Sequence, residues 1–147
     1  MKKEKLKYPD MRAGIIAALD SLSDREYQNK KWCSPTAAHR FWDSIRFPEG
    51  TLIEEMCLDE YPAINLIGYS LLNEKEAELV EKVAKVLVNA LDQIGIEQPD
   101  SAYINSPLWA EVVKSATEAY DFFKKQGFDK EYIDLLKRHR DKEMSKA

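Results

Sequence analysis

The chain of 147 residues has no long apolar stretch, and it is poor in cysteine, glycine and proline. A membrane-spanning helix needs about 18 or more apolar residues in a row, and no run here approaches that length. Residues 1–7 are not followed by the apolar stretch of a secretory signal, so we expect a cytoplasmic protein. With only 5 Gly and 6 Pro, the chain is not of low complexity. We expect a single domain over residues 1–147, frayed at residues 1–7 and 141–147.

Residues that carry common enzyme chemistry are also scarce. The two cysteines, Cys33 and Cys57, and the two histidines, His39 and His139, are too few and too scattered for a zinc site. In a protein without an export signal we expect both thiols to stay reduced. The chain has no Gly-x-Ser-x-Gly elbow and no glycine-rich phosphate-binding loop. These absences argue against a serine hydrolase and against a nucleotide held by backbone amides, and we assign no cofactor.

Helical periodicity dominates the pattern that is present. Apolar residues recur at three- and four-residue steps, which predicts an all-α fold, a single-domain helical bundle of about six or seven helices. The clearest helix starts at the capping box of Asn73 and Glu76 and ends at Gly95. A capping box of Ser23 and Glu26 predicts a short helix, and Pro48 and Gly50 are expected to end another. The predicted helices cover residues 9–22, a short segment after 23, 34–45, 51–57, 73–95, 106–127 and a last helix from 129, and one further helical turn is predicted at 100–104.

Residues 63–72 do not fit this pattern. They are too densely apolar for a clean helical stripe, and Gly68 interrupts them. A single strand would lack a partner, so irregular structure or a helical turn is favoured. The choice between helix and strand stays open at this point.

Acidic residues are concentrated in the middle of the chain. Residues 43–100 hold thirteen Asp and Glu against four Lys and Arg, a local balance of −9 in a protein of net charge −4. The remaining residues therefore sum to +5, much of it near the two ends. This asymmetry indicates a positively charged partner. A sequence pI of about 5.3 argues against nucleic acid as the main partner.

The leading hypothesis is a non-enzymatic binding protein, plausibly an immunity protein that neutralises a cationic toxin such as a nuclease. A nuclease displays Lys and Arg to hold phosphates, and an acidic surface that covers them gains complementary potential. An exposed aromatic residue would serve as an anchor. The candidate partner-binding residues are Asp43, Glu49, Glu54, Glu55, Asp59 and Glu60, with Trp42 or Tyr61 as the anchor.

Two alternatives stay open. Glu54, Glu55 and Asp59 lie close enough in sequence to hold Mg²⁺ through oxygen ligands, and they resemble the Glu-Glu-x-x-Glu element of all-α nucleotide pyrophosphohydrolases. The match is incomplete, because Met56, Cys57 and Leu58 precede Asp59 and no later Glu-x-x-Asp follows on the apolar side. The other alternative is a subunit of a homo-oligomer.

Several short motifs are spread over roughly residues 8–123. They are Pro9-Asp10-Met11-Arg12, Asp24-x-Glu26-Tyr27-Gln28 with Trp32, Ile67-Gly68, and Ala102-Tyr103-x-x-Ser106-Pro107-Leu108-Trp109 leading into Val112-Val113. These motifs resemble a family of small, uncharacterised bacterial helical proteins. That resemblance implies a helical fold and transfers no activity to named positions. A looser likeness is to the immunity proteins of contact-dependent and polymorphic toxin systems, which are small and often acidic.

Overall fold

The computed structural model describes residues 6–29, 46–95 and 100–128. Within these ranges the protein is all-α, which confirms the predicted fold class. The only β-type pairing there is an isolated bridge between Ile67 and Leu71. The helical elements are α1 (Pro9–Ser23), α2 (Arg25–Tyr27), α3 (Arg46–Glu49), the π-helical η5 (Gly50–Glu55), the 3₁₀ helix η6 (Ala63–Leu66), α4 (Glu74–Ile94), α5 (Asp100–Ile104) and α6 (Trp109–Gln126).

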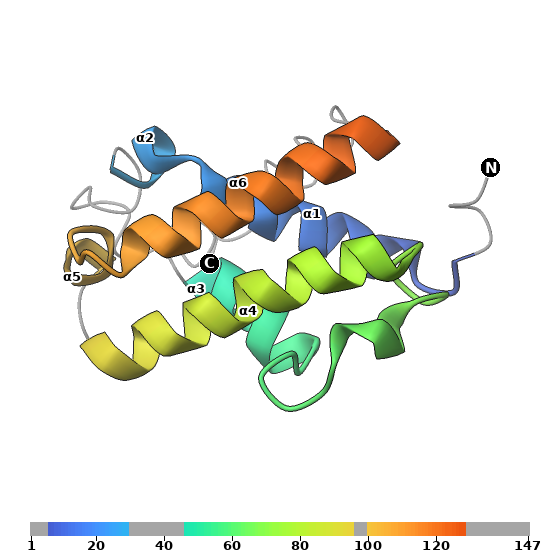
Figure 1. The fold of residues 1–147 in the computed structure, drawn as a ribbon, viewed down its shortest axis with the longest axis horizontal. Helices are drawn as coiled ribbons and strands as arrows, with labels where there is room; N and C mark the ends of the chain where they lie inside the picture. The colour runs from blue at the N-terminus through green and yellow to red at the C-terminus, as the bar shows by residue number, and fades with distance from the viewer. Residues whose placement is uncertain (1–5, 30–45, 96–99, 129–147) are drawn as a thin grey trace, which may run out of the picture.

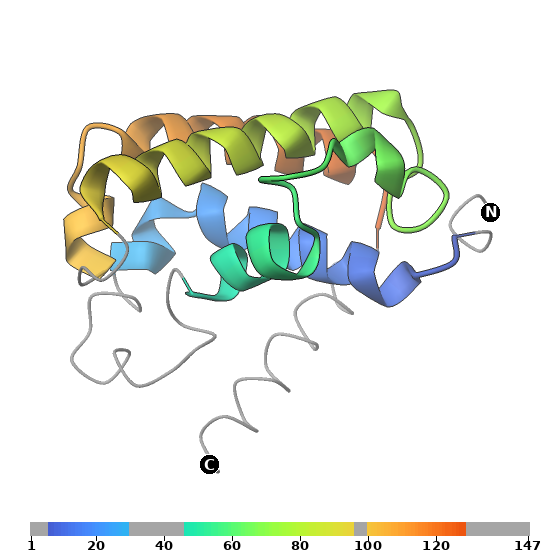
Figure 2. The same ribbon diagram turned by 90° about the horizontal axis from the view of Figure 1, so that it is seen from below.

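Three long helices build the core. Helix α6 packs against both α1 and α4, and it runs in the opposite direction to them (Figure 1). Figure 2 shows α4 and α6 as one layer, with α1 and η5 in the layer beneath. Each helix turns an apolar stripe inward because its apolar residues repeat every three to four positions. The largest fully buried side chains are Trp109, Tyr103, Phe123, Ile15, Ile16, Leu19, Leu22, Leu52, Leu71, Leu87 and Ile104.

The two most periodic segments fold as predicted. Helix α4 begins after Asn73, whose side chain accepts the Glu76 backbone N–H at 2.9 Å, and it ends at Gly95. Helix α6 ends at Gly127, also as predicted, but it starts at Trp109 rather than at Pro107. The turn before it is held by the Ser106 hydroxyl, which accepts the Leu108 backbone N–H at 3.2 Å.

The cap of the short helix α2 differs from the prediction. Asp24, not Ser23, accepts the backbone N–H of the residue three positions on, Tyr27, at 2.9 Å. The Ser23 hydroxyl instead donates to the Asp20 carbonyl of the preceding helix at 2.9 Å. Serine and aspartate are both good N-caps, so the sequence pattern alone could not rank these neighbours.

The predicted helix stop at Pro48 and Gly50 is wrong. Both residues lie inside helical structure, since α3 continues directly into η5. Pro48 lies within α3 and is buried. The wide turns of η5 carry Leu52 into the core, fully buried against α1 and its neighbours. The predicted helices at 34–45 and from 129 lie outside the described residues.

Residues 63–72 are neither a long helix nor a strand. A single 3₁₀ turn, η6, is followed by a tight loop in which the Leu66 carbonyl accepts the N–H groups of Tyr69, Ser70 and Leu71. Gly68 adopts a φ of +92°, a conformation that glycine tolerates and L-residues rarely adopt. The loop then leads into the start of α4.

Candidate functional site

Four of the predicted partner-binding carboxylates lie on one short segment, residues 54–61, which we call the acidic segment. Its backbone is tied to η5, because Met56 N–H donates to the Thr51 carbonyl at 3.1 Å and Leu58 N–H donates to the Leu52 carbonyl at 3.2 Å. Met56 and Leu58 are buried and fix the segment to the core. The charged residues before Met56 and after Leu58 are exposed.

A turn at Cys57 reverses the chain within the acidic segment. Cys57 has a φ of +54°, and its carbonyl accepts the N–H groups of Glu60 at 3.1 Å and Tyr61 at 2.9 Å. Asp59 lies within this turn, and Glu60 and Tyr61 close it. The exposed side chains of the segment are Glu54, Glu55, Asp59, Glu60 and Tyr61, the last of which is 59% exposed.

None of the four exposed carboxylates has an ion pair or a side-chain hydrogen bond within the described parts of the chain. Glu49, a fifth candidate, is half-buried in α3 and has a polar contact of its own, so it does not share their exposure. Trp42 and Asp43 lie outside the described residues. The structure therefore leaves Glu54, Glu55, Asp59, Glu60 and Tyr61 exposed on one short segment, whereas Glu49 is half-buried.

The described residues contain no group of three or more His, Cys, Asp and Glu side chains arranged to hold a metal ion. Glu54, Glu55 and Asp59 thus share one short segment without forming a metal-ligand cluster.

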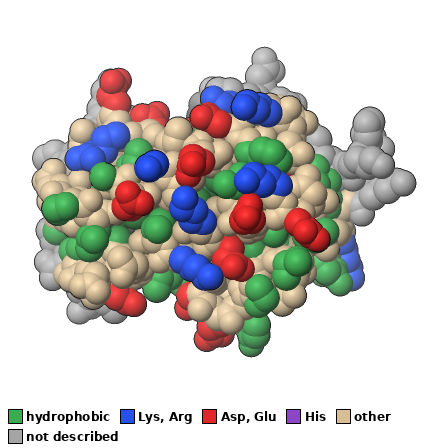
Figure 3. Space-filling model, in the orientation of Figure 1, with side chains coloured by type: hydrophobic (Ala, Val, Ile, Leu, Met, Phe, Trp, Pro, Cys, Tyr) green, Lys and Arg blue, Asp and Glu red, His purple; other side chains and the backbone are tan. Residues whose placement is uncertain are grey.

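Other described acidic residues of the middle region lie on α4, outside the acidic segment. On α4, Glu78 pairs with Lys75 at 3.2 Å and Glu81 with Lys85 at 3.4 Å. Figure 3 shows side chains of both signs interspersed over the face formed by α4 and α6. The local charge balance of −9 in the sequence is therefore spread over several parts of the structure. Among the described residues, the acidic segment is the stretch that holds four exposed carboxylates without an ion pair.

Next to the acidic segment, an open groove of about 550 Å³ lies between η6 and the first half of α4. One side is apolar, with Pro62 and Ile64, and the other carries the glutamates of α4. Ile64 is 52% exposed, whereas its neighbour Ala63 is fully buried. The lining residues are Pro62, Ile64, Glu74, Lys75, Ala77, Glu78 and Glu81.

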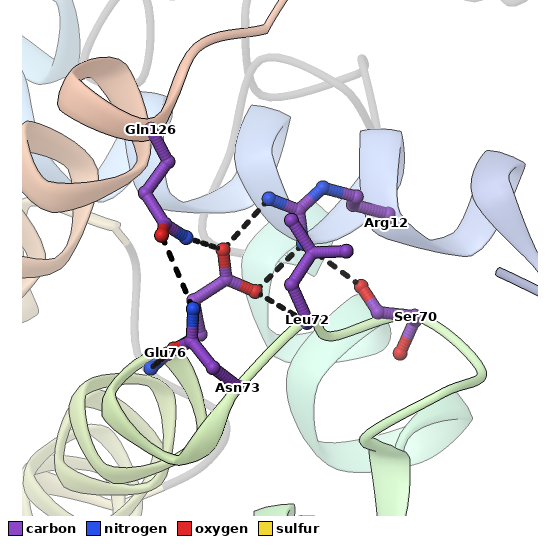
Figure 4. A network of polar contacts seen from close by, with 6 residues as sticks. All are labelled: Arg12, Ser70, Leu72, Asn73, Glu76 and Gln126. Atoms are coloured by element: carbon purple, nitrogen blue, oxygen red, sulfur yellow. Dashed lines mark hydrogen bonds and ion pairs between the residues drawn. The ribbon is translucent and has the colours of Figure 1, made fainter. Parts of the chain in front are cut away.

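A buried ionic network is the main polar feature that sequence reasoning missed. Glu76, assigned only to a helix cap, is fully buried, and its carboxylate pairs with both terminal nitrogens of Arg12, at 2.7 and 2.8 Å (Figure 4). Its Oε1 also accepts the Leu72 backbone N–H at 2.8 Å, and its Oε2 accepts from the Gln126 side-chain amide. Phe123 lies against the guanidinium, with the ring centre 5.0 Å from Cζ.

This network joins α1, the loop before α4, α4 itself and the end of α6. Arg12 Nη1 also donates to the Ser70 carbonyl at 3.3 Å, and Asn73 donates to the Gln126 side chain at 3.1 Å. Arg12 is the only Lys or Arg in α1, and it lies between the apolar residues Met11 and Ala13. A lone cation on an apolar helix face is the signal that could have indicated a buried partner. The network holds the ends of the long helices together and leaves the acidic segment at the surface.

No helix among the described residues is both long and apolar enough to cross a membrane. Searches against curated proteins and against solved structures found no significant match. A protein-family model, by contrast, matches residues 6–131, which is most of the chain. The chain belongs to the family described as Domain of unknown function (DUF7945).

Proposed function

We propose that this protein is a non-enzymatic, cytoplasmic binding protein that docks a basic partner protein on its acidic segment. The observation that carries the proposal is the exposure of four carboxylates, Glu54, Glu55, Asp59 and Glu60, without a cation partner in the described parts of the chain. An interface with a basic protein would supply those cations. Complementary potentials of this kind accelerate association and select partners more than they raise affinity.

Tyr61 adds the second element of a docking surface. Tyrosine is enriched among the residues that dominate interface energies, since it buries a large rigid area and keeps a polar hydroxyl group. At 59% exposure its side chain is available for such contact, directly after the carboxylates in sequence.

The specific form of the proposal is an immunity protein that covers a cationic toxin domain such as a nuclease. The phosphate-binding surface of a nuclease must carry Lys and Arg. An acidic protein that covers this surface would block access of the substrate, and it would also be attracted to the surface electrostatically. The test uses the purified protein encoded by the adjacent gene. Its association rate is measured at about 50 and about 500 mM salt, because the Debye screening length falls from about 14 to about 4 Å over that range. We expect association that weakens steeply with salt.

The matched variants neutralise two charges each. Glu54→Gln/Glu55→Gln alters the acidic segment, whereas Asp92→Asn/Glu111→Gln alters two exposed carboxylates on α4 and α6 and changes the net charge equally. We expect the first variant to slow association several-fold and the second to leave it nearly unchanged. Absence of association at low salt, or equal effects of the two variants, would overturn the proposal.

A further inference from the structure

The groove beside η6 has an apolar side that no described part of the protein covers. Four large apolar side chains are exposed in the described regions: Tyr8, Tyr61, Ile64 and Tyr69. Tyr8 and Tyr69 stack on each other, with ring centres 5.8 Å apart, and Lys7 lies over both rings. Ile64 lines the groove, and Tyr61 lies three positions before it. Among the described residues, no aromatic ring stacks on Tyr61.

The groove is held in shape by an internal hydrogen bond. Glu81 Oε1 accepts the backbone N–H of Ala63 at 2.8 Å, and the fully buried Ala63 fixes η6 against α4. Ile64 follows directly and is thereby presented at the edge of the groove. A site that is already formed before binding loses less conformational freedom when a ligand enters.

The opposite side of the groove is anionic. It carries three glutamates, Glu74, Glu78 and Glu81, against a single lysine, Lys75. Glu74 has no ion-pair partner among the described residues, and the Lys75–Glu78 pair is more than half exposed on both sides, where such pairs are weak. Glu74 and Glu78 are therefore able to accept cations from outside, whereas Glu81 is already paired with Lys85 and with the Ala63 backbone N–H.

We propose that this groove receives an amphipathic, basic segment of a protein partner, which places an aliphatic side chain against Ile64 and Ala77 and directs Lys or Arg to Glu74 and Glu78. The inference rests on the proposed function and extends its surface from the acidic segment across Tyr61 to α4. Charge complementarity selects this occupant, because an acidic or purely apolar segment would leave the glutamates without cations.

The test uses two synthetic peptides of equal charge as probes: a helical peptide of Leu and Lys, and a second peptide in which Ser replaces every Leu. We expect the wild-type protein to bind the Leu peptide about ten-fold more tightly, since burial of one aliphatic side chain accounts for a factor of that size. Ile64→Ser should remove that preference. Glu74→Gln/Glu78→Gln should weaken the binding of both peptides.

Tyr8→Ser serves as the control, because it removes an exposed apolar side chain outside the groove. Ile64 and Tyr8 are both exposed, so neither variant is expected to unfold the protein, and circular dichroism checks this. Equal binding of the two peptides, or equal effects of Ile64→Ser and Tyr8→Ser, would overturn the groove inference.

The two proposals fail separately. If Glu54→Gln/Glu55→Gln slows association with the natural partner while Ile64→Ser leaves peptide preference intact, the groove inference falls and the acidic segment stands. If Ile64→Ser abolishes peptide preference while the charge variant leaves partner association unchanged, the proposed function falls and the groove stands.

Discussion

Arg12 of α1 and Glu76 of α4 form a bidentate ion pair inside the protein, 64 positions apart in sequence. The side chains are 4% and 0% exposed. Water is thus largely excluded from both charges, and each depends on the other and on its hydrogen bonds for compensation.

Glu76→Gln should destabilise the protein by about 3–5 kcal/mol, because it leaves the buried Arg12 guanidinium without a counter-charge. The measurement is urea-induced unfolding followed by circular dichroism. The double variant Arg12→Met/Glu76→Gln should lose less stability than the sum of the two single variants, since it removes both charges. Additive losses would show that the pair does not act as a unit.

Gln28→Leu should cost about 2 kcal/mol or more, because it orphans several buried polar groups at once. The fully buried Gln28 amide donates to the Ser21 and Leu22 carbonyls at 2.8 and 2.9 Å, and its oxygen accepts the Trp109 indole N–H at 2.8 Å. Asn29→Leu, at the exposed next position, is the control and should stay within about 0.5 kcal/mol. Similar unfolding midpoints for the two variants would contradict this role of Gln28.

Lys82→Ala should change the unfolding free energy by less than about 1 kcal/mol. Lys82 and Glu118 join α4 to α6 at 3.5 Å, as Arg12 and Glu76 join α4 to α1, but both side chains are about half exposed. Solvent screens an exposed pair and competes for its hydrogen bonds. A loss as large as that of Glu76→Gln would refute this distinction between the two pairs.

Two glycines should respond in opposite directions to alanine. Gly127 closes α6 with a φ of +96°, and an added Cβ meets nothing within 4 Å, so Gly127→Ala should cost about 1–3 kcal/mol through the backbone alone. Gly14 lies within α1, where an added Cβ would make an ordinary 3.9 Å contact with Thr51 Cγ2, and Gly14→Ala should stabilise by about 0.5–1 kcal/mol. Thermal unfolding measures both changes, and shifts of the same sign would contradict this account.

The sequence predicted correctly those helices whose ends are set by residues within the helix or directly beside it. The Asn73 cap, the apolar stripe and Gly95 all lie within the same stretch as α4, so its bounds follow from neighbouring residues. The continuation of α3 into η5, through Pro48 and Gly50, could not be predicted from neighbouring residues. It depends on packing of η5 against α1, which overrides the two residues as helix breakers.

The sequence predicted which carboxylates form the candidate site, but it did not predict which nearby acidic residues are buried. The exposure of Glu54, Glu55, Asp59 and Glu60 meets the requirement of the predicted surface, although their binding role stays a prediction. The half-burial of Glu49 and the burial of Glu76 arise from contacts between distant segments, which charge counting cannot detect. The groove likewise exists only once η6 lies against α4.

The Arg12–Glu76 pair also constrains how the family can diverge. A chain that loses the acid at position 76 keeps an isolated cation in its interior, and a chain that loses the arginine at position 12 keeps an isolated anion. Single replacements should therefore be rare among relatives. The two positions should covary, with both charges retained or both exchanged for apolar residues.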